Sequence, residues 1–163
     1  MSREPQLSRS LPGQTPLQES ATRDALAAAL AAEHAAVWSY GLASAFLPPT
    51  AAGTVVAGAA AHRARRDALE ALSEAAGIAP VAAAAAYRVP APVTDAVSAA
   101  GLLAVAEDDT TAAWRAVLER TDDPGLRRTG VEAMVAGAIA GVRWRRVAGT
   151  TPLVAVFPGS PTA

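Results

Sequence analysis

Apolar residues recur at intervals of three and four in four long segments of this chain, a spacing typical of helices that pack against one another. In the first segment, one helix face carries Leu26, Leu30, Glu33, Val37, Tyr40, Ser44 and Leu47. Prolines and glycines separate the segments. We therefore predict four helices, starting near Ser20 or Thr22, Thr50 or Thr54, Thr94 and Pro124, and ending near residues 47, 76, 120 and 147.

These helices make one predicted domain over residues 19–149. Residues 1–18 are polar and contain three prolines, so we expect a disordered tail. Residues 150–163 are apolar but bounded by prolines, and we expect an extended segment that lies across the helices or on a partner subunit, or supplies a short strand. Small helix faces and this apolar segment predict a homodimer.

Alanine accounts for 44 of the 163 residues, and aromatic residues make up only 4%. Alanine is the strongest helix former but fills a core poorly, so we expect close helix axes and few large side chains in the core. Three glycines in the fourth segment, Gly130, Gly137 and Gly141, predict close approach of another helix.

Composition also excludes several classes of function. The chain has no cysteine, which excludes disulfides, Cys-ligated metals and thiol nucleophiles. All 14 basic residues are arginine, and the net charge is −1, so nothing favours nucleic-acid binding. No apolar signal segment is visible near the N-terminus, which predicts a cytoplasmic protein. Residues 35–61 are uncharged but broken by two prolines, so no membrane association is expected.

Three ionisable residues fall on the apolar faces of different predicted helices: Glu33, His62 and Glu107. A charged side chain in a helix-bundle core is costly unless it is paired or binds a metal. These positions are the candidate functional site.

The connection at residues 78–93 contains three prolines and is too long for a tight hairpin, which predicts a crossover between the second and third helices. Four helices with one such crossover resemble the ferritin-like superfamily, and the sequence is most similar to an alanine-rich actinobacterial ferritin-like family of unknown function. The segments that carry this resemblance are EHAAVWSYG (33–41), HRARRD (62–67), AEDDT (106–110), AWR (113–115), WRR (144–146) and FPG (157–159).

The resemblance implies an all-α, antiparallel four-helix bundle. Metal-binding members of the superfamily hold two metal ions with a Glu from each of two helices and a Glu-x-x-His pair from each of the others. Glu33 and Glu107 match the single glutamates, and His62 keeps the histidine of one pair, whose glutamate is replaced by Ala59. In the fourth helix, the pair corresponds to Ala140 and Arg143. The resemblance therefore implies a degenerate di-metal site.

Two interpretations of these residues stay open. In the first, Glu33, His62, Arg66, Glu107 and Arg143 form a polar network in the core of a non-catalytic structural, interaction or small-molecule-binding protein without a cofactor. In the second, Glu33, His62 and Glu107 bind Fe or Mn in a metal-dependent oxidoreductase. His34 points about 100° away from Glu33 on an ideal helix, so we do not expect it to contribute.

Other residues allow similar alternatives. Trp38, Trp114 and Trp144 either fill the core or line a pocket for an apolar ligand. The arginine groups at residues 63–66 and 143–146 either bind an anionic ligand or belong to solvated faces.

Overall fold

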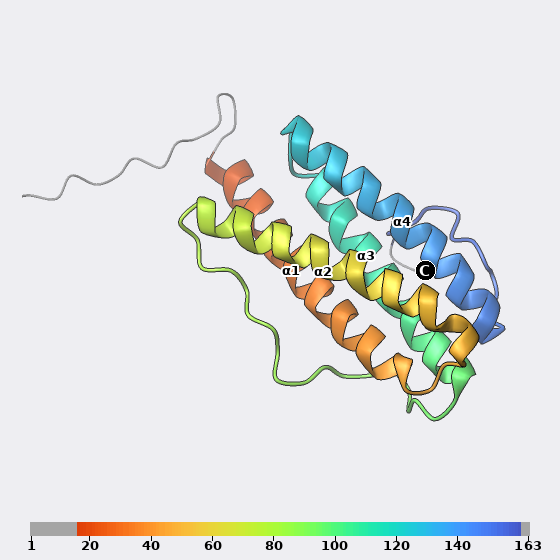
Figure 1. Cartoon of the computed structure of the whole chain (residues 1–163). Coiled ribbons are helices and arrows are strands. Elements are labelled where there is room, and N and C mark those ends of the chain that lie inside the picture. Colours follow the sequence, from red (N-terminus) through yellow and green to blue (C-terminus); the bar gives the residue numbers. More distant parts are fainter. Residues whose placement is uncertain (1–15, 161–163) are drawn as a thin grey trace, which may run out of the picture.

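The computed structural model describes residues 16–160, with side chains described from residue 19. It contains four α-helices, α1 (Pro16–Ser44), α2 (Ala52–Ala75), α3 (Ala96–Leu118) and α4 (Pro124–Ala148), and a 3-10 helix, η1 (Pro49–Ala51) (Figure 1). Within residues 16–160 there is no β-strand. The predicted disordered tail at 1–18 lies outside the described residues, except that helix α1 begins at Pro16 rather than at Ser20 or Thr22.

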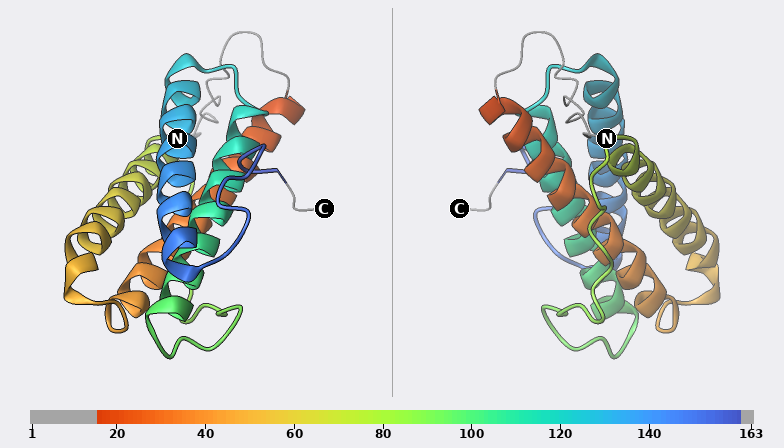
Figure 2. Two further views of the ribbon diagram at one scale, coloured as in Figure 1. Left: turned by 90° about the vertical axis from the view of Figure 1, so that its right-hand side faces the viewer. Right: turned by 90° about the vertical axis from the view of Figure 1, so that its left-hand side faces the viewer.

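The helices pack in a simple order. Helix α1 contacts α2 and α3, and α3 contacts α4. The other pairs of α-helices make few contacts, and Figure 2 shows the ribbons of α2 and α4 diverging toward the end where α2 begins. The segment joining α2 to α3 runs back along the helices to the end where α3 begins (Figure 1). None of the described helices is long and apolar enough to cross a membrane.

Local sequence explains where the helices end. Gly77 and Gly149 follow α2 and α4 with φ values of 70° and 68°, a left-handed conformation that glycine adopts without strain. Helix α4 begins at Pro124 as predicted, and Asp123 caps it by accepting a hydrogen bond from the Leu126 backbone N–H at 2.7 Å. Helix α3 begins at Ala96, two residues after the predicted start at Thr94, because Asp95 caps it in a reciprocal capping box with Ser98.

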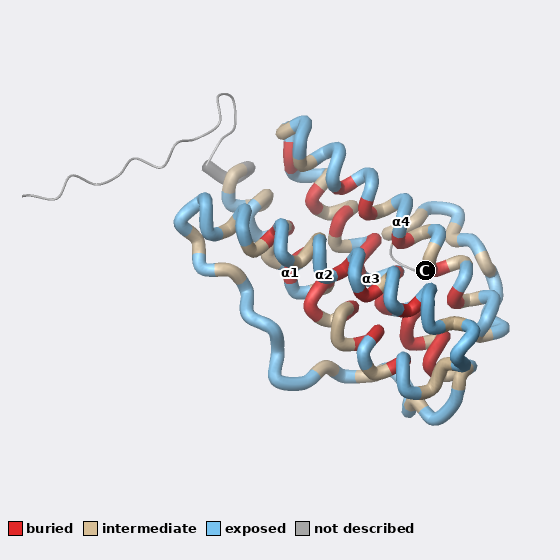
Figure 3. The backbone as a smooth tube through the Cα atoms, in the orientation of Figure 1, coloured by how far each residue is buried: buried red, intermediate tan, exposed pale blue. Residues whose placement is uncertain are grey.

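The core has an apolar layer at each end and a polar layer between them. The buried residues of one apolar layer are Tyr40, Ala43, Val55, Ala59, Ala99, Ala100, Leu103, Ala104 and Trp144. Those of the other are Ala25, Ala29, Leu30, Leu69, Trp114, Val117 and Ala133. On each of their helices, Glu33, His62 and Glu107 come between the residues of one apolar layer and those of the other. Figure 3 shows the buried positions along the facing sides of the helices.

Glycines bring some elements unusually close. A Cβ at Gly58 would overlap the phenol ring of Tyr40, so α2 passes directly over this ring. A Cβ at Gly137 would lie 2.5 Å from Thr111 Oγ1, and one at Gly130 would lie 2.8 Å from the Leu118 side chain. The predicted close approach therefore holds at Gly130 and Gly137, where α4 packs on α3. Gly141 instead faces Arg145 of its own helix.

The two long non-helical segments lie against the helices. The α2–α3 connection is held by His34 Nε2, which lies 3.0 Å from the carbonyl oxygen of Val81, and by packing of Trp38 on Tyr87. The C-terminal segment lies over α3 and α4, with Arg145 donating to the carbonyl oxygen of Leu153 and Arg115 donating to Ser160 Oγ. Over residues 150–160 it forms turns and bends, without the short strand that was one alternative.

Candidate functional site

Glu33 of α1, His62 of α2 and Glu107 of α3 meet in the centre of the molecule. Their exposed fractions are 0%, 1% and 1%. His62 Nδ1 lies 2.7 Å from Glu33 Oε2, and His62 Nε2 lies 3.3 Å from Glu107 Oε1. The imidazole ring therefore bridges two carboxylates from two other helices.

Arg65 completes this cluster, one residue away from the predicted partner. Its Nε donates to Glu33 Oε1 at 2.7 Å. Arg66 instead pairs with the exposed carboxylate of Asp67 at 2.6 Å, and Arg143 is exposed on α4, so neither joins the network that we predicted. On an ideal helix Arg65 and Arg66 lie about 60° and 40° to either side of His62, so periodicity cannot distinguish them. The position of α1 selects Arg65.

Aromatic donors supply the remaining hydrogen bonds. Trp114 Nε1 donates to Glu33 Oε1 at 2.7 Å, and the Tyr40 hydroxyl donates to Glu107 Oε1. Trp144 Nε1 donates to the Tyr40 oxygen at 2.9 Å. Sequence reasoning placed Tyr40 on the buried face but missed its role. Its position seven residues after Glu33 on the same helix face was the available signal.

The charges of the cluster balance. Burial by itself raises the pKa of Glu33, but the hydrogen bond from His62 and the positive charges of Arg65 and His62 hold this pKa below its ordinary value. Burial likewise lowers the pKa of His62, but hydrogen bonds to Glu107 and Glu33 and their negative charges raise it above its ordinary value. The favoured state is an imidazolium that donates to both carboxylates. Two positive and two negative charges then compensate one another.

This protonation state rules out a hydrogen bond at one close contact within the cluster. Arg65 Nη2 lies 2.8 Å from His62 Nδ1. Because the protonated Nδ1 donates to Glu33, it has no lone pair for Arg65, and the productive bond of the guanidinium is the one from Nε to Glu33. The pKa of Tyr40 is raised above its ordinary value by burial, then by the negative charge and hydrogen bond of Glu107, so its hydroxyl remains a donor.

This arrangement does not suit a metal centre. Each nitrogen of His62 faces a different carboxylate, so Glu33 and Glu107 lie at opposite edges of the ring. A single metal ion bound to one of these nitrogens would therefore be close to only one of the two carboxylates. Across residues 19–160, no group of three or more Asp, Glu and His side chains is arranged to hold a metal ion. Ala59 and Ala140 offer no ligand atoms, and His34 lies outside the cluster, near Val81 and 3.5 Å from Glu70.

Two of the three tryptophans belong to the cluster, because Trp114 and Trp144 are buried and donate into it. Trp38 is only half-buried and packs on Tyr87. A pocket of about 390 Å³ lies between α2 and α4, beside Tyr40 and Trp144. Pockets of about 420 and 850 Å³ lie along the C-terminal segment.

Comparison with known proteins places this geometry in a family. Residues 25–162 match the family described as "Domain of unknown function (DUF4439)". The chain belongs to this family. The DUF4439 match covers residues 25–44 of α1, the whole of α2, α3 and α4, and the chain to residue 162, and so includes every residue of the buried cluster. It agrees with the expected family of unknown function and leaves the ferritin-like relationship as a prediction.

A solved structure supports the same architecture. The crystal structure of a conserved hypothetical protein, rv2844, from Mycobacterium tuberculosis is similar to this DUF4439 chain with a TM-score of 0.77 and 38% sequence identity. The similarity covers 86% of this chain and 99% of that one. A comparison with curated proteins gave no match.

Proposed function

We propose that this protein is a non-catalytic, ferritin-like four-helix bundle whose central charges stabilise the fold and whose outer surfaces bind a ligand or partner. The observation that carries this proposal is that two cations of the protein itself, His62 and Arg65, neutralise two buried carboxylates. His62 contacts both Glu33 and Glu107, and Arg65 contacts Glu33. In a ferritin-like metal site the ions supply this positive charge. The long α2–α3 connection supports the bundle topology, because it returns the chain to the opposite end of the helices.

The alternative is a metal-dependent oxidoreductase using Glu33, His62 and Glu107. What favours this alternative is that three side chains of ligand type lie together in the core, although a metal would have to replace the contacts that the two His62 nitrogens now make with Glu33 and Glu107. Bound iron or manganese would then require His62 to release a proton from one ring nitrogen, because only a neutral imidazole is a ligand.

Metal content distinguishes the two functions. We would measure iron, manganese and zinc per chain by elemental mass spectrometry, on untagged protein from cells supplied with all three metals. Glu107→Ala removes a cluster carboxylate, and Glu74→Ala removes an exposed one from α2 as a matched control. We expect all three proteins to contain only background metal. About one metal per chain, lost in Glu107→Ala and kept in Glu74→Ala, would establish the metal-binding alternative.

We also propose that the protein is a cytoplasmic homodimer. Support comes from apolar side chains that remain outside the core: Val131 and Val135 of α4 are 52% and 55% exposed, and Val56 of α2 is 64% exposed. Val131 and Val135 lie one turn apart on α4, and exposed apolar neighbours of this kind are typical of protein interfaces. Sedimentation equilibrium measures the subunit number directly.

A further inference from the structure

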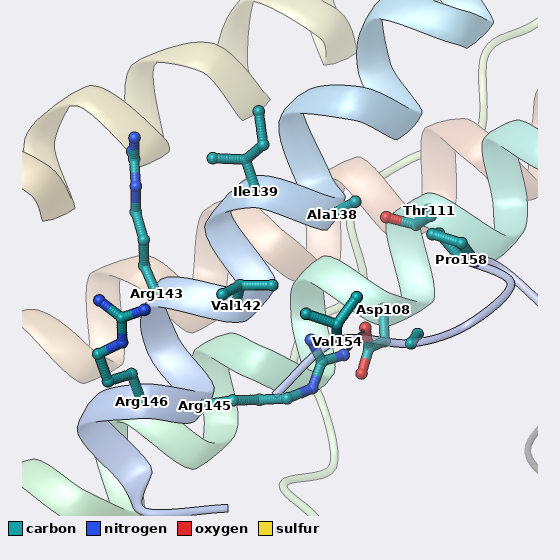
Figure 4. A pocket seen from close by; sticks show the side chains of 11 residues that line it. Asp108, Thr111, Ala138, Ile139, Val142, Arg143, Arg145, Arg146, Val154 and Pro158 are labelled. Atoms are coloured by element: carbon teal, nitrogen blue, oxygen red, sulfur yellow. Dashed lines mark hydrogen bonds and ion pairs between the residues drawn. The ribbon is translucent and has the colours of Figure 1, made fainter. Parts of the chain in front are cut away.

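A pocket of about 420 Å³ lies between the outer face of α4 and the C-terminal segment (Figure 4). Its volume is within the range of about 300–1,000 Å³ that small-molecule sites occupy. The buried charge cluster described above does not line it. This pocket is therefore a separate feature of the surface.

Most of its wall is apolar. Ala138, Ile139 and Val142 form one side on α4, and Val154 and Pro158 of the C-terminal segment form the opposite side (Figure 4). Ile139 is 49% exposed and Val154 is 62% exposed, although both are apolar. A ligand with an apolar body would remove this surface from water.

Two arginines without acidic partners lie at one end of this wall. Arg145, which also lines the pocket, is neutralised by Asp108 and donates to the carbonyl oxygen of Leu153. Arg143 and Arg146 differ from it, because no ion pair within residues 19–160 involves either one. Figure 4 shows both side chains beyond Val142 on α4, with Arg143 extending toward α2 and Arg146 lying near the base of Arg143.

We propose that this pocket binds one molecule of an amphiphilic anion, with its carboxylate or phosphate head group at Arg143 and Arg146 and its apolar body against Ile139, Val142 and Val154. A guanidinium matches both head groups through two parallel hydrogen bonds. The pocket is concave and bounded by Pro158 and Val154, which suits a single molecule better than the flat surface of a bilayer. This inference deepens the small-molecule-binding part of the proposed function and rests on it.

Isothermal titration of the full chain with decanoate, decyl phosphate and uncharged decanol, all kept monomeric, tests the proposal. We expect at least one of the two anions to bind at least tenfold more tightly than decanol, with about one molecule per chain. The anion that binds more tightly identifies the head group. Ile139→Asn, which makes the wall polar, should weaken binding of that anion without affecting folding, because Ile139 is half exposed.

The arginines are tested by a matched pair of double variants. Arg143→Gln with Arg146→Gln should weaken anion binding at least tenfold and remove the preference over decanol. Arg63→Gln with Arg128→Gln removes the same charge from exposed positions elsewhere and should leave binding unchanged. Circular dichroism checks that both variants fold.

In the titration, no binding or equal affinity for decanol and the anions would overturn the proposal. Equal loss of binding in both double variants would also overturn it. So would binding to anionic phosphatidylglycerol vesicles by a protein that does not bind monomeric decanoate or decyl phosphate. The metal measurement remains independent of these outcomes. A chain that lacks metal and binds no amphiphile would keep the non-catalytic bundle and lose only this site.

Discussion

Arg65 and Arg66 are neighbours on α2 but have partners of different kinds. Arg65 donates to Glu33, whose side chain is completely buried, whereas Arg66 pairs with Asp67, whose side chain is 60% exposed. Water can solvate Asp67 when its partner is removed, but it cannot reach Glu33. The same substitution at adjacent positions should therefore have different consequences.

We predict that Arg65→Gln lowers the free energy of unfolding by roughly 3–5 kcal/mol, because it leaves a buried carboxylate without one of its cations. Arg66→Gln should cost about 1 kcal/mol or less, as is typical of exposed ion pairs. Urea unfolding followed by circular dichroism measures both. Equal losses in the two variants would show that Arg65 does not stabilise the cluster.

The sequence identified the cluster only in part. Glu33, His62 and Glu107 were found because a charge on an apolar face is visible in the pattern. Arg65, Tyr40 and Trp114 were not, because their contacts join different helices. Trp114 lies seven residues after Glu107 in α3, yet it donates to Glu33 of α1.

At the level of elements, small residues decide how closely the helices approach. Helix α4 turns Gly130, Ala133, Gly137 and Gly141 toward the core, while Val131, Val135 and Ile139 remain exposed. Apart from Trp144, the inward face of this helix therefore carries only small residues. Close contact with α3 determines this orientation, because a larger residue at Gly137 would meet Thr111.

Gly58 provides a direct test of this packing. Helix propensity alone favours alanine over glycine by about 1 kcal/mol. At Gly58 the added methyl group would overlap the Tyr40 ring, which is held by Glu107 and Trp144. We predict that Gly58→Ala lowers the free energy of unfolding by about 1–3 kcal/mol, the usual cost of an overpacked core.

Gly101→Ala is the matched control, since no atom lies within 4 Å of a Cβ at this position in α3. It should leave stability unchanged or raise it by up to about 1 kcal/mol. Thermal unfolding of the two variants measures the difference. A Gly58→Ala protein as stable as Gly101→Ala would contradict the close contact between α2 and Tyr40.

For the whole molecule, the polar layer makes stability dependent on pH. The pKa of His62 is raised from 6.5 in the folded protein, so its contribution is complete below about pH 6.5 and is lost as pH rises through the folded pKa. The pKa of Glu33 is lowered from 4.5, so its contribution is complete above about pH 4.5 and is lost as pH falls through the folded pKa. Both contributions are complete between these values.

We therefore predict that the contribution of these two groups to the free energy of unfolding is highest near pH 4.5–6.5. This contribution decreases at lower and at higher pH. Urea titrations at a series of pH values measure this profile. His62→Gln should remove the alkaline decrease, whereas His34→Gln, outside the cluster, should keep it. An alkaline decrease that persists in His62→Gln would assign it to other groups.

The sequence by itself determined the number of helices and most of their ends, because periodicity, proline, glycine and capping residues act within a few residues of one another. Helix α4 begins at Pro124 as predicted and ends at Ala148, one residue after the predicted end, while α3 begins at Ala96, two residues after the predicted Thr94. The match over residues 25–162 shows a family of unknown function, and the ferritin-like relationship stays a prediction. Only the tertiary structure decided that Arg65 neutralises Glu33 and that Arg143 faces outward, because a turn of 100° per residue leaves each choice to the neighbouring helix.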